Sequence, residues 1–313
     1  MKPQGKQAIR VSGFLISVIA AVLFSTKAIF VKSAYKQTGV DAVTLLTLRM
    51  LFSLPFYLVA AWLVGRKEDK KTLTTKQYLW IITLGILGYY LSSVFDFIGL
   101  QYVSAGLERL ILFLYPTFSV LLNTFLFKAK LTRTQLIALV LTYAGIGIAY
   151  LGELQQVELH NSQFYFGSLM IFFCAITYSV YLVGTGRMVN RVGVTRYTTY
   201  VMLSSTAGIF IHFLLKRNVQ YISFTTPLMG YSIALAIIAT VIPSFMMSSG
   251  MKKIGSNNVS IITSIGPVST TLQAYYFLDE KILDVQIIGT IMVIIGVVLI
   301  GWQFSSTAEK PIA

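Results

Sequence analysis

Residues 95–152 read FDFIGLQYVSAGLERLILFLYPTFSVLLNTFLFKAKLTRTQLIALVLTYAGIGIAYLG, and residues 246–303 read MMSSGMKKIGSNNVSIITSIGPVSTTLQAYYFLDEKILDVQIIGTIMVIIGVVLIGWQ. A shift of 151 positions aligns the two stretches without a gap and matches Gly99 with Gly250, Pro116 with Pro267 and Gly145 with Gly296. A shift of 154 positions aligns the first apolar run of the chain with the sixth. Self-similarity at a fixed shift indicates an internal repeat. We therefore divide the chain into two related halves, 1–152 and 153–313.

Composition places both halves in a lipid bilayer. The chain has 313 residues, of which 56% are hydrophobic and 12% are charged. Soluble proteins carry about 25% charged residues, because their surfaces face water. Apolar runs long enough to cross about 30 Å of hydrocarbon fall near 11–31, 42–64, 78–100, 102–127, 133–151, 164–184, 197–215, 228–250, 257–278 and 284–303. The sequence predicts an all-α membrane protein with ten transmembrane helices.

The distribution of basic residues predicts the orientation. With the N-terminus inside, 17 of the 25 Lys and Arg residues fall in cytoplasmic segments, five fall outside and three lie within helices. Cytoplasmic loops are enriched in Lys and Arg, so both termini are expected in the cytoplasm and the protein in a cytoplasmic (inner) membrane. The same spacing of the basic clusters by apolar runs argues against nucleic-acid binding, despite a net charge of +14.

An odd number of helices in each half has a consequence for topology. Five helices per repeat require the second copy to enter the membrane upside down, giving two inverted five-helix repeats. The loop charges agree, because the basic loop 128–133 aligns with the acidic loop 279–284. Inverted repeats with a binding site between them are typical of alternating-access transporters. This symmetry is the strongest functional signal in the sequence.

The stretch from Tyr102 to Asn123, followed by Leu131, Thr132, Gln135 and the helix of Gly145, resembles the EamA-type branch of the drug/metabolite transporter superfamily. The segment 254–301 resembles the same module. The resemblance implies a five-plus-five inverted arrangement around a central cavity, and export or exchange of small metabolites such as amino acids. Family members often have small or apolar residues where this chain has Glu108 and Arg109, so the substrate of a relative does not transfer.

Five ionisable residues fall inside predicted spans: Lys27, Arg49, Asp96, Glu108 and Arg109. A charge in the bilayer core costs at least ~2.5 kcal/mol, so such residues are functional candidates. All five lie in the outer third of the first half, and none of their counterparts in the second half is charged. Together they leave one surplus positive charge.

These charges suggest a substrate-binding role for Lys27, Arg49, Glu108 and Arg109. Arginine suits a carboxylate, and Glu108 would bind an amine or accept a proton, with Asp96 as a second candidate for proton coupling. A zwitterionic, amino-acid-like solute fits both halves of this hypothesis. The alternative is that the residues form static ion pairs near the headgroups.

Helix 102–127 offers further candidates. Tyr115 shares a face with Glu108 and is expected to bind substrate, and Tyr89, Tyr90 and Tyr178 are considered as aromatic walls. Three prolines lie inside spans and are interpreted as kinks or gates: Pro116, Pro243 and Pro267. The alternative for them is packing alone.

Other features are interpreted as structural. Gly289 and Gly296 are seven positions apart in one span, and the aligned Ala138 and Gly145 repeat this spacing, so these small residues favour close helix packing, within the chain or between two copies. The loop residues Asp279 and Glu280 are expected to be solvated, and the single cysteine, Cys174, to be a small buried side chain. With only two histidines, His160 and His212, no metal site is expected, and no cofactor or catalytic motif is found.

The sequence thus predicts a secondary active transporter, not an enzyme, that exports a small polar or zwitterionic metabolite by alternating access, with Glu108 and Asp96 as the candidates for proton coupling. Two alternatives stay open: uptake or exchange of an anionic solute, and a membrane receptor or scaffold without transport. The expected partners are the small-molecule solute and the lipid bilayer. Whether the protein is a monomer or a homodimer is left open.

Overall fold

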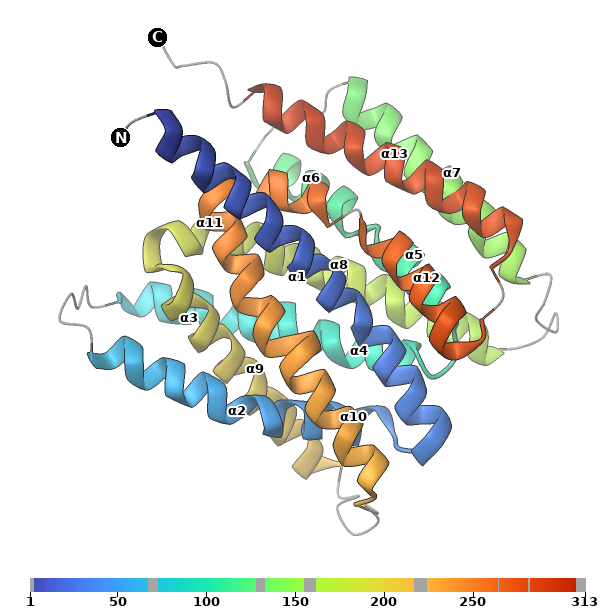
Figure 1. Cartoon of the computed structure of the whole chain (residues 1–313), viewed down its shortest axis with the longest axis horizontal. Coiled ribbons are helices and arrows are strands. Elements are labelled where there is room, and N and C mark those ends of the chain that lie inside the picture. The colour runs from blue at the N-terminus through green and yellow to red at the C-terminus, as the bar shows by residue number, and fades with distance from the viewer. Residues whose placement is uncertain are drawn as a thin grey trace.

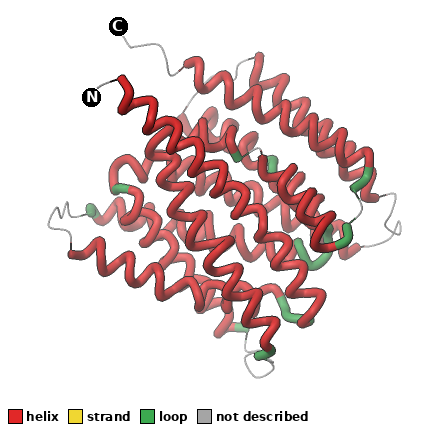
Figure 2. The backbone as a smooth tube through the Cα atoms, in the orientation of Figure 1, coloured by secondary structure: helices red, strands yellow, loops and turns green. Residues whose placement is uncertain are grey.

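The computed structural model describes residues 3–66, 73–127, 133–154, 162–216, 224–263, 265–280 and 282–307. Within these ranges every regular element is a helix (Figure 2). The helices are α1 (Pro3–Thr38), α2 (Ala42–Arg66), α3 (Thr75–Leu84), α4 (Ser92–Gly99), α5 (Ala105–Leu112), α6 (Tyr115–Phe127), α7 (Arg133–Leu154), α8 (Ser162–Val192), α9 (Val194–Leu215), α10 (Thr226–Ala236), α11 (Ile242–Ile262), α12 (Ile265–Leu278) and α13 (Asp284–Thr307).

Six helical stretches of the described residues are long and apolar enough to cross a membrane. They are Val11–Thr38, Ala42–Arg66, Thr75–Gly99, Ser162–Val192, Val194–Leu215 and Thr226–Ile254. Their outward side chains are apolar, as at Trp62, Leu79 and Ile211, each at least half exposed. Apolar patches of this extent need a non-aqueous partner. The protein is an all-helical, multi-pass membrane protein, and the count of ten spans stays a prediction.

The fourth predicted span, 102–127, is not one helix. α5 ends at Leu112 and α6 begins at Tyr115, with Phe113 and Leu114 between them. Pro116 has no backbone N–H to donate to Leu112, so the helix stops before it and a new one starts with the proline in its first turn, where a missing N–H is tolerated. Pro267 occupies the first turn of α12 in the same way. The sequence predicted kinks here, and the structure has breaks.

Two π-helical segments widen the third and eighth predicted spans. Gly85–Leu91 joins α3 to α4, and Ile237–Val241 joins α10 to α11. The shift of 151 positions that aligns the two halves places one segment on the other. Pro243 follows the second segment directly, at the second position of α11. Such insertions are often found at functional sites.

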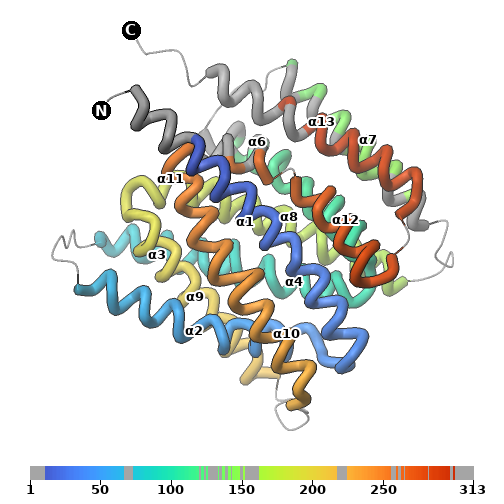
Figure 3. Tube along the Cα trace, viewed as in Figure 1, coloured from blue at the N-terminus to red at the C-terminus, as the bar shows by residue number. Residues whose placement is uncertain are grey.

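Helices from the two halves interleave. α1 packs on α11 and α12, and α8 packs on α4 and on α5 and α6, while α2 pairs with α9 (Figures 1 and 3). α7 and α13 lie side by side along one flank. A Cβ added to Gly145 of α7 would meet the carbonyl oxygen of Gly289 at 2.6 Å. The predicted glycine packing therefore joins two helices of one chain.

Candidate functional site: a charged cavity between the halves

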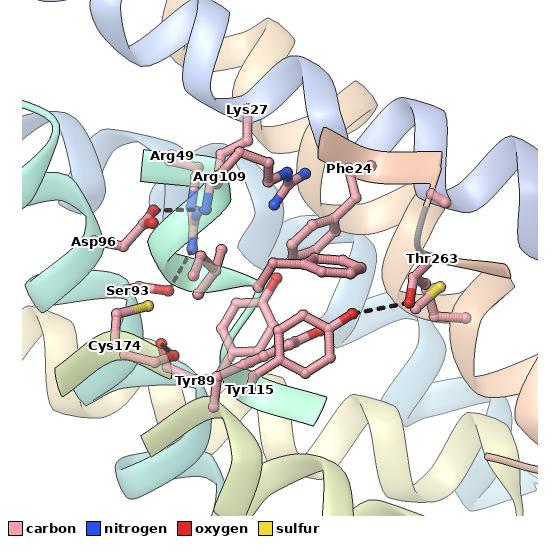
Figure 4. A pocket seen from close by; sticks show the side chains of 17 residues that line it. Phe24, Lys27, Arg49, Tyr89, Ser93, Asp96, Arg109, Tyr115, Cys174 and Thr263 are labelled. Atoms are coloured by element: carbon pink, nitrogen blue, oxygen red, sulfur yellow. Dashed lines mark hydrogen bonds and ion pairs between the residues drawn. The ribbon is translucent and has the colours of Figure 1, made fainter. Parts of the chain in front are cut away.

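The cavity lies where α1, α2, α4, α5, α6, α8, α11 and α12 meet, and Figure 4 shows its walls. The volume open to the centres of water molecules is about 50 Å³, which is room for a few waters. Four of the five predicted ionisable residues line it: Lys27, Arg49, Asp96 and Arg109. Tyr115 lines it as well. Arg49 is 47 positions from Asp96 and 60 positions from Arg109 in the sequence, so the fold brings these residues together.

Lys27 is the centre of the ionic cluster. Its Nζ atom lies 2.6 Å from Oδ2 of Asp96 and 3.5 Å from Oε1 of Glu108. All three side chains are buried, with Lys27 6% exposed and Glu108 fully enclosed. A buried charge is tolerated when it is paired, so one ammonium group serves two carboxyl groups from α4 and α5.

Glu108 does not contribute to the cavity wall. It lies beside Lys27 and Asp96, with Oε1 3.5 Å from Nζ of Lys27. The sequence placed Glu108 on the cavity side with Tyr115, because both fall on one face of an unbroken helix. The break at Phe113 and Leu114 separates the two residues into different helices, so the shared face does not exist. The binding of solute by Glu108 stays a prediction.

Arg49 is held differently from the other cations. Its guanidinium lies 5.0 Å from the ring centre of Phe97 and 5.7 Å from that of Tyr89, and Nη2 donates to Oγ of Ser93 at 3.2 Å. Among the described residues no carboxylate lies within ion-pair distance of Arg49, and its Nε has no partner. The side chain is only 2% exposed. Arg49 is a buried cation at the cavity wall without an anionic partner in the described chain.

Arg109 joins the two halves. Its Nε donates to Oγ1 of Thr270 at 3.2 Å, and its Nη2 donates to Oγ of Ser25 at 3.2 Å. Gly266 lies against the same guanidinium, and a Cβ there would be 3.6 Å from Nε. Arg109 therefore packs α5 onto α1 and α12 at the edge of the cavity.

The remaining walls are aromatic and apolar. Tyr89 and Tyr178 line the cavity as considered from the sequence, together with Phe24 and Phe113. Tyr90 does not; its hydroxyl meets Nδ1 of His212 at 3.1 Å. The counterpart of Asp96 in the second half, Met247, is also a lining residue, so the charged residues of the wall all come from the first half.

Sequence reasoning missed some residues of this wall. Ser93 and Phe24 each precede a buried charge, Asp96 and Lys27, by three positions, so a search of the i−3 neighbours of each buried charge would have found them. Thr263 had no such signal. Cys174 is buried as expected, and it also lines the cavity.

Glu280 contradicts the expectation of a solvated loop charge. Its Oε1 accepts from the backbone N–H of Ala105 at 3.1 Å, and its Oε2 from that of Gly106 at 3.5 Å. A carboxylate at a helix N-terminus is favoured by the unpaired N–H groups and the helix dipole. The pairing joins residues 175 positions apart, which no local pattern reveals.

Taken together, the fold and the cavity define a class: a multi-pass helical membrane protein with a buried charged chamber, as in transporters of small solutes. The EamA-like transporter family model matches residues 11–151 and 165–302. An uncharacterized transporter of Bacillus subtilis, YcbK, is 30% identical over 294 residues, covering 89% of each chain. An uncharacterized transporter of Archaeoglobus fulgidus is 26% identical over 291 residues, covering 91% of this chain and 94% of its own.

One solved crystal structure covers 96% of this chain and 99% of its own with a TM-score of 0.68 at 20% identity, which shows a shared fold. The chain belongs to the EamA-like transporter family. The resemblance noted in the sequence is thus confirmed. Family and relatives indicate a transporter rather than an enzyme, acting on a small solute in the bilayer.

Proposed function

We propose that this protein is a secondary active transporter that exports a small zwitterionic, amino-acid-like metabolite by alternating access. The single observation that carries the proposal is Arg49, a cation buried at the cavity wall without a described carboxylate partner. A buried unpaired charge is costly. A solute carboxylate would supply the missing anion, and guanidinium can bind it in a bidentate manner.

The fixed surroundings of Arg49 support this role. The guanidinium contacts the rings of Phe97 and Tyr89, and its Nη2 donates a hydrogen bond to Ser93. A preorganised arginine loses little side-chain entropy when it binds a carboxylate. The amino group of a zwitterion would meet Asp96 and the aromatic faces of the same wall, which accept cations.

Proton coupling is assigned to Glu108 and Asp96. Both carboxyl groups share Lys27, so three groups carry a net charge of −1 when all are ionised. One proton on either carboxyl group removes that excess. Charged groups within a membrane are typical of proton relays. Loading or releasing this proton would change the net charge of the cluster of Lys27, Asp96 and Glu108.

The proposed architecture is ten helices in two inverted repeats, with both termini in the cytoplasm and the protein in the inner membrane. Several observations support it. The helix breaks before Pro116 and Pro267 fall at aligned positions, as do the two π-helical segments. α1 packs on α11 as α8 packs on α4, and the family model matches over two segments.

A second candidate function is transport of an anionic solute. The cavity wall itself carries three cations, Lys27, Arg49 and Arg109, and one carboxylate, Asp96, since Glu108 is not part of it. This surplus favours an anion over a zwitterion. Flux under an imposed potential separates the two functions, because an anion is itself driven by the potential, whereas a zwitterion has no net charge and responds only through protons coupled to it.

The proposal is tested with purified protein in proteoliposomes. A panel of amino acids and monocarboxylates is screened by thermal stabilisation, since a ligand that binds the folded state raises its stability. Flux of each hit is then measured for Arg49→Lys and Arg49→Gln. We expect solute affinity to fall about tenfold or more in both variants, because lysine cannot form the bidentate contact.

Arg66→Lys is the matched control. Arg66 lies at the end of the same helix, α2, stacked over Trp62 at 3.7 Å and away from the cavity. It should leave affinity unchanged. If Arg49→Gln transports every hit as well as the unaltered protein does, Arg49 does not bind the solute and the proposal fails.

Orientation is tested separately by labelling single cysteines. Arg133 and Asp284 are the exposed first residues of α7 and α13 and are aligned by the shift of 151 positions. In a Cys174→Ser background, Arg133→Cys should react with an impermeant thiol reagent only from the cytoplasmic side, and Asp284→Cys only from the outside. Reaction from one common side would contradict the inverted repeat.

A further inference from the structure

Glu280 sits at the junction of two half-helices from opposite halves of the chain. α12 ends at Leu278, and Asp279 follows with φ 57°. The N–H of Glu280 donates to the carbonyl of Ala274 at 3.3 Å. A residue in the left-handed conformation directly after the last turn ends a helix, and the return bond from Glu280 spans six positions. This ending fixes the backbone of Glu280 and directs its side chain to α5.

The carboxylate of Glu280 completes the N-terminus of α5. It accepts from Ala105 and Gly106, while the hydroxyl of Ser104 accepts from Leu107 at 3.0 Å. The first N–H groups of a helix otherwise have no partner. The N-terminus of α5 is therefore bound by a residue of the other half.

Two more polar contacts continue the same seam toward the cavity. Arg109 of α5 donates to Thr270 of α12. Beyond the helix breaks, the hydroxyl of Tyr115 meets that of Thr263 at 2.8 Å. Along these three contacts the residue numbers rise from 105 to 109 to 115 in the first half and fall from 280 to 270 to 263 in the second half. The two segments of the chain therefore run antiparallel. Tyr115, Arg109 and Thr263 line the cavity, and Glu280 marks the far end of the seam.

Beyond Glu280 the surface is hollowed. Lys32, Tyr35, Gln101 and Leu278 line this outer hollow together with Glu280. The α5–α12 seam thus separates two spaces, the inner cavity and the hollow at the end of the bundle that loop charges place outside. Only the Glu280 contact of the three touches the hollow.

We propose that Glu280 is the latch of the outer gate, and that the cavity opens to the outside when its carboxylate leaves the N-terminus of α5. This inference rests on the proposed alternating-access transport. Release exposes the N–H groups of Ala105 and Gly106 to the hollow, where water satisfies them. The seam then opens from its outer end toward Tyr115 and Thr263.

The chain contains its own reporter for this opening. Cys174 is the single cysteine of the sequence, is 4% exposed and lines the cavity. An impermeant, negatively charged methanethiosulfonate applied to intact cells reaches Cys174 only through an open outer gate. The full-length protein is tested unaltered and as Glu280→Ala, Glu280→Gln and Asp279→Asn.

We expect outer-side labelling of Cys174 to speed up about tenfold in Glu280→Ala, because a charge-assisted hydrogen bond to the helix is lost. Glu280→Gln keeps an acceptor oxygen without the charge and should give a smaller increase. Asp279→Asn removes the neighbouring charge and keeps a side chain that tolerates positive φ, so its labelling should match the unaltered protein. Thermal unfolding of each variant confirms that labelling reports opening and not loss of fold.

Equal labelling in Glu280→Ala and Asp279→Asn would overturn the latch, and so would an increase confined to the cytoplasmic side. The assay requires no solute. If labelling responds as expected and no solute is transported, the latch stands and the proposed function fails. If solute flux depends on Arg49 but the rate of Cys174 labelling is the same in the Glu280 variants, the transport proposal is supported and the proposed role of Glu280 as the latch is contradicted.

Discussion

The hydroxyl of Tyr115 and the hydroxyl of Thr263 are hydrogen-bonded at 2.8 Å across the two halves of the chain. Tyr115 begins α6 and Thr263 lies between α11 and α12, so the bond joins the two helix breaks. Each break precedes a proline, Pro116 in one half and Pro267 in the other. The two interruptions that the prolines impose thus meet beside the cavity.

Removing this bond should cost little stability and reveal a direct coupling. Tyr115→Phe and Thr263→Val should each lower the free energy of unfolding by about 0.5–1.5 kcal/mol. The double variant should lose less than the sum, because the second change removes a partner that is already unpaired. Thermal unfolding of the three variants in detergent measures the coupling. Strictly additive losses would show that the two hydroxyls do not interact.

Lys27 is expected to be the most sensitive position of the ionic cluster. Lys27→Met leaves Asp96 and Glu108 buried without their shared cation, which should destabilise the protein by about 3–5 kcal/mol. Adding Asp96→Asn and Glu108→Gln to Lys27→Met should recover part of that loss, since neither carboxylate is then left buried without its cation. Unfolding temperatures of the single and triple variants provide the measurement. A triple variant less stable than Lys27→Met would argue against the ion-pair assignment.

Two glycines of α7 offer a matched pair for testing helix packing. A Cβ at Gly145 would lie 2.6 Å from the carbonyl oxygen of Gly289 and 2.8 Å from Cβ of Met292, whereas a Cβ at Gly147 would meet nothing within 4 Å. Gly145→Ala should therefore destabilise by about 1–3 kcal/mol. Gly147→Ala should be neutral or stabilise by up to about 1 kcal/mol, because alanine favours the helix. Similar unfolding temperatures for both variants would contradict the close approach of α7 and α13.

Asp41 predicts a small pH dependence outside the membrane spans. Burial alone would raise its pKa, but hydrogen bonds from Thr44 and Lys216, with the Lys216 charge 3.0 Å away, lower the pKa below its ordinary value. A lowered folded-state pKa adds stability above the ordinary pKa of about 4, and this stability is lost as the pH falls through the folded value.

The pair is about two-fifths exposed on each side, so its contribution should stay within about 0.2–1 kcal/mol. Unfolding temperature between pH 3 and pH 7 is compared for the unaltered protein and Lys216→Met. The difference between them should be largest near neutrality and shrink in acid. A difference that grows in acid would have the wrong sign.

Sequence reasoning reached the membrane class, the family and the charged residues of the cavity wall. Lys27, Arg49, Asp96 and Arg109 could be predicted because a charge within an apolar run is costly unless something requires it. Which of them pair could not be predicted, since that depends on how each helix is rotated by packing. Glu108 is an example of this limit. The prediction that it shares a helix face with Tyr115 assumed one unbroken helix, and the break at Phe113 and Leu114 removes that assumption.

The contact of Glu280 with α5 lay beyond sequence reasoning for a different reason. An acidic residue in a loop is usually solvated, and its partner here is backbone, which carries no sequence signature. By contrast, Pro116 and Pro267 pointed to interruptions because the missing N–H acts locally. Effects that act within a few residues could be predicted from the sequence, whereas contacts between distant segments could be found only from the structure.

The length of α8 has a consequence for the surrounding lipid. Its 31 residues extend about 46 Å at a rise of 1.5 Å per residue, well beyond about 30 Å of bilayer hydrocarbon. A helix of that length must lie oblique to the membrane normal or project into the headgroup layer. Because α8 carries Tyr178 and Cys174 of the cavity, its tilt is tied to the chamber. Acyl-chain length is therefore an external variable that should tune the shape of the protein.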